Sequence, residues 1–145
     1  MVAGNGILLV EDNPDEAVLT LRALRGHRID TPVEVAHDGV EALHYILPSE
    51  SPSVANLPRL VILDLKLPRL DGFDVIRRLR ADPRTRLLPL VVFSSSAEDR
   101  DVGCCYEMGV NGYVAKPVDA DHYHAAVGSI LNYWMDHNLD PYRRI

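Results

Sequence analysis

The sequence predicts an α/β fold: a doubly wound, five-stranded parallel sheet with five helices. Short and almost continuously apolar runs recur along the chain, as is typical of strands buried on both faces of a parallel sheet. Segments with apolar residues at helical spacing separate these runs, so strand and helix alternate five times. Connections of this length imply crossovers between parallel strands. The 145 residues suffice for one hydrophobic core and are too few for two ordinary domains.

Five segments have the pattern of strands. Three continuous apolar runs are predicted as central strands, one segment alternates as an edge strand does, and a short fifth segment follows Asn111-Gly112. In chain order the predicted strands are Ile7–Val10, Val33–Ala36, Leu60–Leu63, Leu90–Phe93 and Tyr113–Ala115.

Five further segments place apolar residues on one helical face. The first begins near Pro14 and ends at Gly26, because proline suits the first turn of a helix and glycine its end. Asp82-Pro83 stops the third helix, and the Ser- and Pro-rich stretch 48–58 is predicted as a surface loop. The marker residues are Ala17, Val18, Leu21 and Leu24; Val40, Leu43 and Ile46 or Leu47; Phe73, Ile76 and Leu79; Val102 and Tyr106; and Tyr123, Val127, Ile130 and Trp134.

Charge and cysteine content argue against several classes of protein. With 15 Lys and Arg against 21 Asp and Glu, the formal net charge is −6, which disfavours nucleic acid and anionic membranes as partners. No segment has the pattern of a secretory signal or a membrane-spanning helix. The two cysteines, Cys104 and Cys105, are adjacent and give no disulfide framework, so we expect a cytoplasmic location. We expect one domain over residues 1–137 and a C-terminal tail over 138–145.

Polar side chains follow four of the predicted strands, at the ends where open parallel sheets bind ligands. Glu11 and Asp12 follow the first strand, Asp64 the third, Ser94 the fourth and Lys116 the fifth. A single Asp or Ser beyond a strand is usually a helix cap or a turn residue. Because all five fall at the same end of the strands, we expect them to converge on one functional site.

Each of these residue types has a separate role in phosphoryl transfer. Clustered carboxylates repel one another unless a cation lies among them, and Mg²⁺ prefers oxygen ligands. The Asp64 carboxylate can act as a nucleophile and form an acyl phosphate, while the cation neutralises charge on the transferring group. The Lys116 ammonium adds positive charge, and the Ser94 hydroxyl can donate to a phosphoryl oxygen.

Four motifs carry a resemblance to a known family. In their order and spacing the chain resembles the receiver domain of bacterial two-component response regulators over nearly its whole length. The resemblance implies a flavodoxin-like receiver fold with strand order 2-1-3-4-5. The motifs are ILLVEDN at 7–13, LVILDLKLP at 60–68 with LDG at 70–72, PLVVFS at 89–94, and GYVAKP at 112–117.

The resemblance assigns the phosphoryl acceptor and the metal ligands. It implies that a histidine kinase phosphorylates Asp64. Mg²⁺, which Mn²⁺ can replace, is expected to bind Asp64 and Asp12 directly, Glu11 largely through water, and the backbone carbonyl of Lys66. Glu11 stands where the commonest pattern has Asp, and it keeps the carboxylate.

The resemblance also implies a conformational switch. Ser94, in place of the commoner Thr, and Lys116 are expected to close on the phosphoryl group, and Tyr113 to turn inward behind Ser94. A cis peptide bond is expected between Lys116 and Pro117, since it would help to place the lysine.

By this resemblance the chain is a single-domain response regulator, a switch that catalyses only its own phosphorylation and dephosphorylation. The alternatives are a phosphate-relay intermediate, a phosphate sink without a dedicated output, or an aspartyl-phosphate phosphatase. A phosphatase of the haloacid dehalogenase type would need Asp-x-Asp after its first strand, where this chain has Glu11-Asp12. The stretch 48–58 and the ending 131–141 are similar to those of small response regulators that partner bacterial phytochrome kinases. A sensor histidine kinase, and among these a bacteriophytochrome, is therefore the expected partner.

We also expect a homodimer through the last helix and the tail. On a wheel of about 100° per residue, Leu131, Met135 and Leu139 form a second apolar stripe beside the one that the sheet can bury, with Tyr133 on its other flank. An exposed apolar strip often marks a partner surface, and two-fold dimers are the commonest oligomers. The alternative is a tail that folds back over Leu131 and Met135 within one chain.

Overall fold

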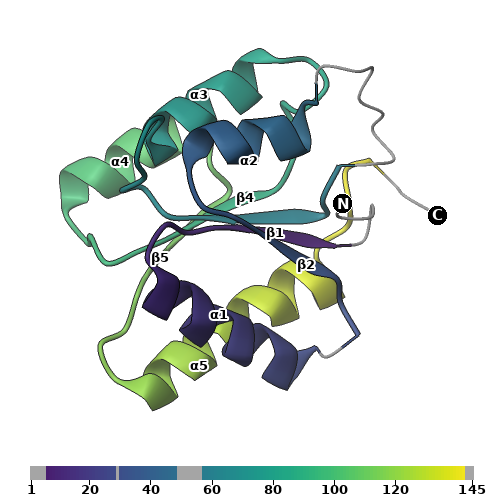
Figure 1. The fold of residues 1–145 in the computed structure, drawn as a ribbon. Helices are drawn as coiled ribbons and strands as arrows, with labels where there is room; N and C mark the ends of the chain where they lie inside the picture. The colour runs from purple at the N-terminus through teal and green to yellow at the C-terminus, as the bar shows by residue number, and fades with distance from the viewer. Residues whose placement is uncertain (1–5, 29, 49–56, 143–145) are drawn as a thin grey trace.

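The computed structural model describes residues 6–28, 30–48 and 57–142. Along this part of the chain five strands alternate with five α-helices, and a short π-helix, η2, follows the last of them (Figure 1). The elements are β1 (Ile7–Val10), α1 (Pro14–His27), β2 (Val33–Ala36), α2 (Gly39–Ile46), β3 (Leu60–Leu63), α3 (Gly72–Ala81), β4 (Leu90–Ser94), α4 (Asp99–Glu107), β5 (Gly112–Ala115), α5 (Ala120–Leu131) and η2 (Asn132–His137).

All five strands are parallel and lie in the order β2-β1-β3-β4-β5, so the predicted fold class and strand order are confirmed. Val10 is in register with Ala36 of β2 and with Leu63 of β3, and these three strands therefore end level with one another. Ser94 pairs with Ala115 where β4 and β5 end. The strand order reverses between β1 and β3, which is where sheets of this kind bind ligands.

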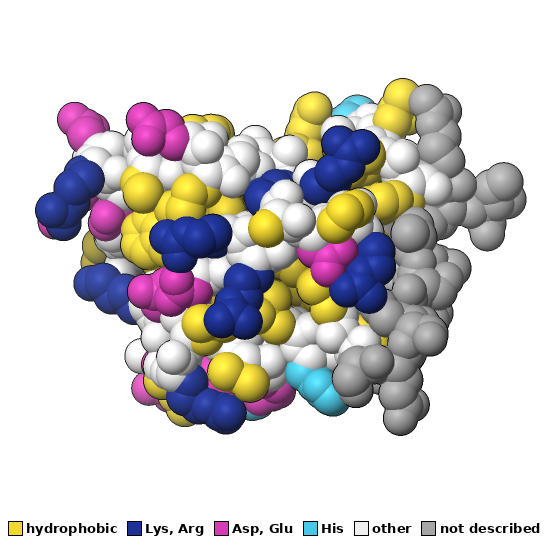
Figure 2. Space-filling model, turned by 90° about the horizontal axis from the view of Figure 1, so that it is seen from above, with side chains coloured by type: hydrophobic (Ala, Val, Ile, Leu, Met, Phe, Trp, Pro, Cys, Tyr) yellow, Lys and Arg dark blue, Asp and Glu magenta, His cyan; other side chains and the backbone are white. Residues whose placement is uncertain are grey.

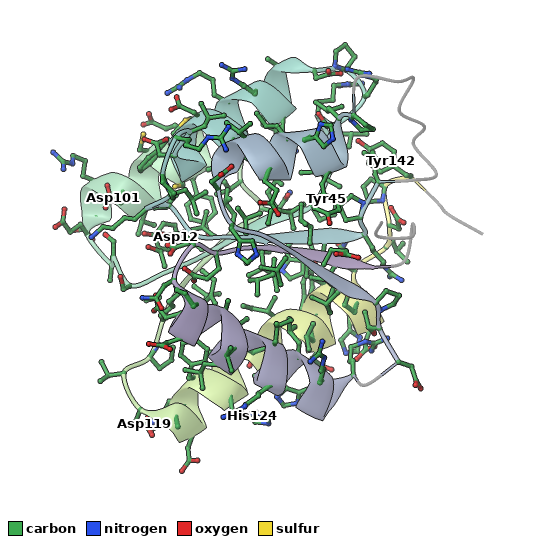
Figure 3. The ribbon with its side chains drawn as sticks, in the orientation of Figure 1. Asp12, Tyr45, Asp101, Asp119, His124 and Tyr142 are labelled. Atoms are coloured by element: carbon green, nitrogen blue, oxygen red, sulfur yellow. The ribbon has the colours of Figure 1, made fainter. Side chains whose placement is uncertain are left out.

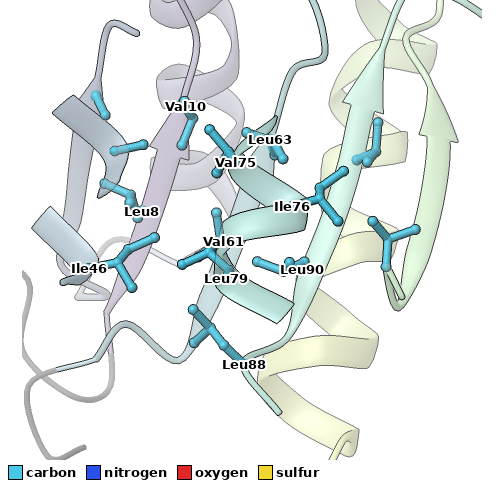
Figure 4. Packing of buried hydrophobic residues seen from close by; sticks show 14 of the residues in the cluster. Leu8, Val10, Ile46, Val61, Leu63, Val75, Ile76, Leu79, Leu88 and Leu90 are labelled. Atoms are coloured by element: carbon cyan, nitrogen blue, oxygen red, sulfur yellow. The ribbon is translucent and has the colours of Figure 1, made fainter. Parts of the chain in front are cut away.

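Helices cover both faces of the sheet and bury a hydrophobic cluster against each. α1 and α5 lie side by side on one face, and α2, α3 and α4 lie on the other (Figure 1). Successive side chains of a strand point to opposite faces. Val61 therefore packs in the cluster with Leu79 of α3 (Figure 4), whereas its neighbour Ile62 packs in the cluster with Leu24 of α1 and Val127 of α5. Full burial of each such side chain stabilises the fold by about 1.5–3 kcal/mol.

Side-chain caps fix where the helices begin at the edge where the strands end. The Asn13 Oδ1 accepts hydrogen bonds from the backbone N–H groups of Asp15 and Glu16, at 2.9 and 3.2 Å, which starts α1 directly after β1. Asp38 and Asp71 cap α2 and α3 in the same way. The N-termini of these helices are thereby held beside the carboxyl ends of the strands.

Gly72 allows α3 to begin against the end of β3. Its N–H donates to the carbonyl of Leu65 at 2.9 Å. A Cβ atom at this position would lie 2.5 Å from the carbonyl oxygen of Asp64. Any larger residue here would therefore displace the backbone that carries Asp64.

The observed elements differ little from the predicted ones. β4 extends to Ser94, β5 begins at Gly112, and α1 ends at His27, one residue past the predicted stop. In α4 the buried residue is Cys105, whereas the marker residue Tyr106 is half exposed. The predicted loop at 48–58 lies largely outside the described residues.

The apolar face of the last helix is covered within the chain. Leu131 and Met135 are buried, so the expectation of an exposed second stripe is wrong for these two residues. The reason is that α1, as well as the sheet, packs against α5, and Leu131 and Met135 belong to the hydrophobic cluster that also contains Leu24 of α1. Two faces of α5 are therefore buried instead of one.

The helical period also changes after Leu131. The Asn138 N–H donates to the carbonyl of Tyr133 at 2.6 Å, which is the i→i+5 bonding of a π-helix. A wheel of constant angle no longer applies to such a segment. Leu139 lies beyond the helix and is 75% exposed, and Tyr133 is half exposed.

Charges of both signs share the face formed by α2, α3 and α4 (Figure 2). Arg77 of α3 forms an ion pair with Asp74 at 2.5 Å. Arg80 donates to the carbonyl of Gly109 and to the side chain of Asn111, so it joins α3 to the loop before β5. These two arginines thus contact groups of the chain itself. None of the helices in the described part of the chain has both the length and the apolar composition needed to span a membrane.

Candidate functional site

The polar side chains predicted at the strand ends do lie together at one edge of the sheet. Glu11 follows β1, Asp64 follows β3, Ser94 is the last residue of β4, and Lys116 follows β5. The side chains of all four are almost inaccessible to solvent. The parallel register positions them there. Because neighbouring strands end at the same level, the residues that follow those strands lie close together.

The Lys116 ammonium is the centre of this arrangement. Its Nζ lies 2.5 Å from a carboxylate oxygen of Glu11, 3.3 Å from one of Glu16 and 3.4 Å from one of Asp64. An ammonium has three N–H donors and no acceptor, so three carboxylates can share it. Its backbone N–H donates to the carbonyl of Ser94 at 2.8 Å, which continues the β4–β5 ladder and fixes where the side chain starts.

The peptide bond between Lys116 and Pro117 is trans, so the expectation of a cis bond is wrong; the described residues contain no cis peptide bond. The trans form is the more stable one before proline, by about 0.5–1 kcal/mol. With this bond trans, the lysine side chain already reaches both Glu11 and Asp64.

Burial and charge act in opposite directions on these groups. Burial raises the pKa of the Glu11 carboxyl to about 7; the hydrogen bond from Lys116 opposes this rise, and the charge of Asp64 adds to it. Burial lowers the pKa of Lys116, but the hydrogen bond to Glu11 and the charges of Asp64, Glu11 and Glu16 outweigh it and raise the pKa above its usual value. Lys116 therefore stays a cation, while the carboxylates around it are not fully balanced.

These carboxylates fit a small divalent cation. Among the described residues, ligand oxygens of Glu11, Glu16 and Asp64 lie within 4.8 Å of one another. When ionised they carry three negative charges against the single positive charge of Lys116. Mg²⁺ and Mn²⁺ both favour oxygen ligands, and a divalent cation would offset both the burial of the Glu11 carboxylate, which raises its pKa, and the repulsion from Asp64, which adds to this rise.

The composition of this carboxylate group differs from the predicted metal ligands. Asp12 lies at the same edge of the sheet (Figure 3) but is exposed and does not belong to the group, so direct metal ligation by Asp12 stays a prediction. Glu16 does belong to it and was missed by sequence reasoning. Glu16 is the third residue of a helix that begins at the site, and this position was the available signal.

A chain of hydrogen bonds connects the Ser94 hydroxyl to α4 through Ser96. The Ser96 N–H donates to the Ser94 Oγ at 3.2 Å, and the Ser96 hydroxyl donates to Asp101 of α4 at 2.6 Å. The Tyr113 hydroxyl donates to the Ser96 carbonyl at 2.7 Å. Burial raises the pKa of Tyr113, against the lowering effect of its hydrogen bonds to Ser96 and Ser94. The two residues predicted for the switch, Ser94 and Tyr113, are therefore joined through Ser96.

A cavity of about 470 Å³ lies beside the site, between the loops that follow β3 and β4. Lys66, Phe73, Ser96 and Asp101 are among its lining residues. Lys66 is exposed, and metal binding by its backbone carbonyl stays a prediction. The loop that carries Ser96 thus borders both the site and this cavity.

Comparison with known proteins assigns a family to this geometry. A family model described as the response regulator receiver domain matches residues 7–128. The probable methanogenesis regulatory protein FilR2 of Methanothrix harundinacea is 37% identical over 135 residues, which cover 93% of this chain and 86% of FilR2. The response regulator Rcp1 of a Synechocystis species is 30% identical over 130 residues, which cover 90% of this chain and 88% of Rcp1.

Solved structures match the whole arrangement of elements. The phosphorylated cyanobacterial phytochrome response regulator RcpA has a TM-score of 0.85 and 30% identity, over 96% of this chain and 99% of RcpA. The Mn²⁺-bound form of Rcp1 has a TM-score of 0.83 and 28% identity, over 94% of this chain and 99% of Rcp1. One of these two structures is thus phosphorylated, and the other holds a divalent metal.

Proposed function

Because this chain belongs to the response regulator receiver domain family, we propose that it is a phospho-acceptor switch, a single-domain response regulator that takes a phosphoryl group from a histidine kinase onto Asp64. The observation that carries the proposal is the position of the Asp64 carboxylate. Its Oδ1 accepts from the Leu65 N–H at 2.8 Å, and its Oδ2 lies 3.4 Å from Lys116. The carboxylate is thus oriented by the backbone, with one oxygen beside a cation.

The proposed transfer uses this geometry. An Asp64 oxygen attacks the phosphorus of a phosphohistidine; the new P–O bond forms as the P–N bond breaks, and the electron pair of the broken bond returns to the imidazole. Lys116 holds its positive charge beside the acceptor oxygen. Mg²⁺, or Mn²⁺ in its place, would bind Glu11 and Asp64, with Asp12 and the Lys66 carbonyl as further predicted ligands, and would neutralise charge on the phosphoryl oxygens.

Phosphorylation would then change the surface near α4. We propose that the Ser94 hydroxyl moves toward a phosphoryl oxygen and that Tyr113 follows. The hydrogen bonds through Ser96 support this coupling, because a shift of Ser94 alters the position of the group to which Tyr113 and Asp101 are bonded. The chain itself would catalyse only its own phosphorylation and dephosphorylation.

The chemical nature of the phosphorylated group tests this function. After incubation with radiolabelled acetyl phosphate and Mg²⁺, we expect label that is released by neutral hydroxylamine, because an acyl phosphate reacts with this nucleophile and a phosphate ester does not. Label that resists hydroxylamine would mean modification of a hydroxyl group. In that case an aspartyl phosphate would not be the product.

We propose a bacterial phytochrome histidine kinase as the partner. The support is the similarity to RcpA, which is a phytochrome response regulator, and to Rcp1. We also propose that the two proteins meet in the cytoplasm, the reducing compartment that suits the free thiols of Cys104 and Cys105. Phosphotransfer from a phytochrome kinase should differ between red and far-red light and exceed transfer from an unrelated kinase. Equal transfer from both kinases would contradict this partner.

We also propose a homodimer, now through fewer apolar residues than the sequence predicted. Leu131 and Met135 are buried, so its remaining support is the exposure of Tyr133 and Leu139 near the end of the chain. Sedimentation at tens of micromolar should detect a dimer that Leu139→Glu dissociates. An exposed apolar residue of α4, Tyr106, offers the matched control Tyr106→Glu, which should leave the dimer intact. A monomeric parent chain would end this proposal.

A further inference from the structure

Glu16 is a charged residue of the site, and the sequence predicted no role for it. Its carboxylate lies 3.3 Å from the Lys116 ammonium and within 4.8 Å of the carboxylates of Glu11 and Asp64. Its side chain is 35% exposed, whereas that of Glu11 is 2% exposed. Glu16 therefore combines direct access to the site with contact to solvent.

The capping of α1 leaves the Glu16 carboxylate free to face Lys116. A glutamate at the third helical position often accepts a hydrogen bond from the backbone N–H of the cap residue. Here that N–H, of Asn13, donates to the Glu11 Oε2 at 3.3 Å. The Asn13 side chain accepts the backbone N–H of Glu16 at 3.2 Å, which fixes the start of its side chain beside the site. The position of Glu16 thus follows from the local structure of the turn between β1 and α1.

We propose that Glu16 is a positioning residue that sets the charge balance of the site: it holds Lys116 and favours a divalent cation before phosphorylation, and it opposes the arrival of the phosphoryl group on Asp64. This role rests on the proposed function. The Lys116 ammonium donates hydrogen bonds to Glu11 and Asp64, and Glu16 is its third ion-pair partner, at 3.3 Å. A phosphoryl oxygen that accepts from Lys116 competes with these three carboxylates for the ammonium.

Glu16 is the partner that can release Lys116 at the lowest cost in free energy. Water can hydrate its partly exposed carboxylate once the lysine moves. Glu11, in contrast, would be left as a buried carboxylate without its cation, which is strongly unfavourable. The lysine is therefore expected to exchange Glu16 for the phosphoryl group and to keep Glu11.

Removal of the Glu16 charge is expected to affect two ligands in opposite directions. A divalent cation is attracted by one negative charge fewer, so its binding weakens. An anionic phosphoryl analogue on Asp64 meets one negative charge fewer and no longer competes with Glu16 for the lysine, so its binding becomes tighter. A substitution that only loosened the structure would weaken both ligands.

The experiment compares Glu16→Gln with Asp15→Asn. Asp15 is the neighbouring acidic residue in the first turn of α1, is exposed and lies outside the carboxylate group, so its substitution removes the same charge from the same turn. The binding of Mn²⁺ is measured by electron paramagnetic resonance of the free ion, and the binding of beryllium trifluoride at saturating Mn²⁺ by calorimetry. For Glu16→Gln we expect Mn²⁺ to bind about fivefold more weakly and the fluoride complex about threefold more tightly, after allowance for solvent screening. For Asp15→Asn both constants should stay within about twofold of the parent.

A third variant and the parent chain separate the possible outcomes. Glu16→Asp keeps the charge and should restore most of the Mn²⁺ affinity. If Glu16→Gln weakens both ligands, or matches Asp15→Asn for both, Glu16 does not set the charge balance, although the phospho-acceptor function would stand. A parent chain that binds neither Mn²⁺ nor the fluoride complex would overturn the proposed function and the role of Glu16 with it.

Discussion

Among single residues, Glu11 is the one in which burial and charge conflict most strongly. Its carboxyl group is buried beside Asp64, and one lysine has to compensate for both. The pKa of about 7 expresses this conflict, because the protonated form avoids the cost of a second buried negative charge. A bound divalent cation would favour the ionised form of Glu11 and so lower its pKa. Glu11 thereby links metal binding to pH.

This link predicts how the stability of the metal-free chain depends on pH. The Glu11 carboxyl ionises near pH 4.5 in the unfolded chain and near pH 7 in the folded one, so the folded state binds more protons between these values. The free energy of unfolding should therefore fall as pH rises through this window, by on the order of 3 kcal/mol from Glu11. Urea denaturation in EDTA measures it, and Glu11→Gln should show a shallower fall. Equal slopes for parent and variant would contradict the assignment.

Sequence patterns placed most of the site because its residues directly follow strands. Asp64, Ser94 and Lys116 lie where the predicted sheet puts them. Glu16 was missed because its role depends on how the turn after β1 directs a helical side chain, and no strand pattern contains that information. The prediction of a cis peptide bond before Pro117 was wrong. It came from the family resemblance, and the contacts of Lys116 do not require a cis bond.

Among the elements, the loop between β4 and α4 is the one that connects the site to a surface. Ser96 in this loop bonds to Ser94 through its N–H, to Tyr113 through its carbonyl and to Asp101 through its hydroxyl. These contacts join β4, β5 and α4. A displacement of Ser94 therefore has a direct mechanical route to α4.

The hydrogen bond between Tyr113 and Ser96 can be removed without changing the packing of the ring. Tyr113→Phe should lower the free energy of unfolding by about 0.5–1.5 kcal/mol, because the Ser96 carbonyl loses its donor. It should also reduce the change in hydrogen exchange that beryllium trifluoride causes in α4, measured by mass spectrometry. Tyr106→Phe, at an exposed tyrosine on α4, is the matched control and should preserve that change. If beryllium trifluoride changes hydrogen exchange in α4 of Tyr113→Phe as much as in the parent, the Tyr113–Ser96 hydrogen bond does not couple the site to α4.

Element boundaries were predictable where a residue pattern determines them directly. The three apolar runs gave β1, β3 and β4 to within one residue, since burial on both faces leaves no room for polar side chains. The alternation in β2 and the turn before β5 gave the two outer strands to within one residue as well. The last helix was less predictable. Leu131 and Met135 are buried in a cluster with residues of α1 and of the sheet that are distant in sequence, and the π-type turn that follows Leu131 shifts the helical period.

At the scale of the whole molecule, the C-terminal segment, residues 132–142, crosses the end of the sheet that lies opposite the site. Figure 3 places Asp12 and Tyr142 at opposite ends of the strands. The segment leaves α5 on one face, where Asp136 pairs with Arg28, and reaches the other face, where Tyr142 packs against the hydrophobic cluster and donates to the carbonyl of Arg84 at 2.9 Å. It therefore joins the two layers that flank the sheet.

This arrangement predicts that stability and phosphorylation can be separated. Tyr142→Ala should lower the free energy of unfolding by about 1–2 kcal/mol, because it removes buried ring surface and a hydrogen bond. Phosphorylation by acetyl phosphate should stay at the parent level, since the site lies at the other edge of the sheet. Val118→Ala, at an exposed apolar residue outside this segment and outside the proposed dimer contact, should change stability by less than about 0.5 kcal/mol. A loss of phosphorylation in folded Tyr142→Ala would refute this separation.

The central claim is that Asp64 accepts a phosphoryl group in a metal-dependent step, and intact-protein mass after incubation with acetyl phosphate tests it most directly. With Mg²⁺ the parent chain should gain the mass of one phosphoryl group. Asp64→Asn should gain none, because an amide cannot form the acyl phosphate, and the parent in EDTA should gain almost none. A phosphoryl gain by Asp64→Asn, or undiminished gain by the parent in EDTA, would contradict the claim.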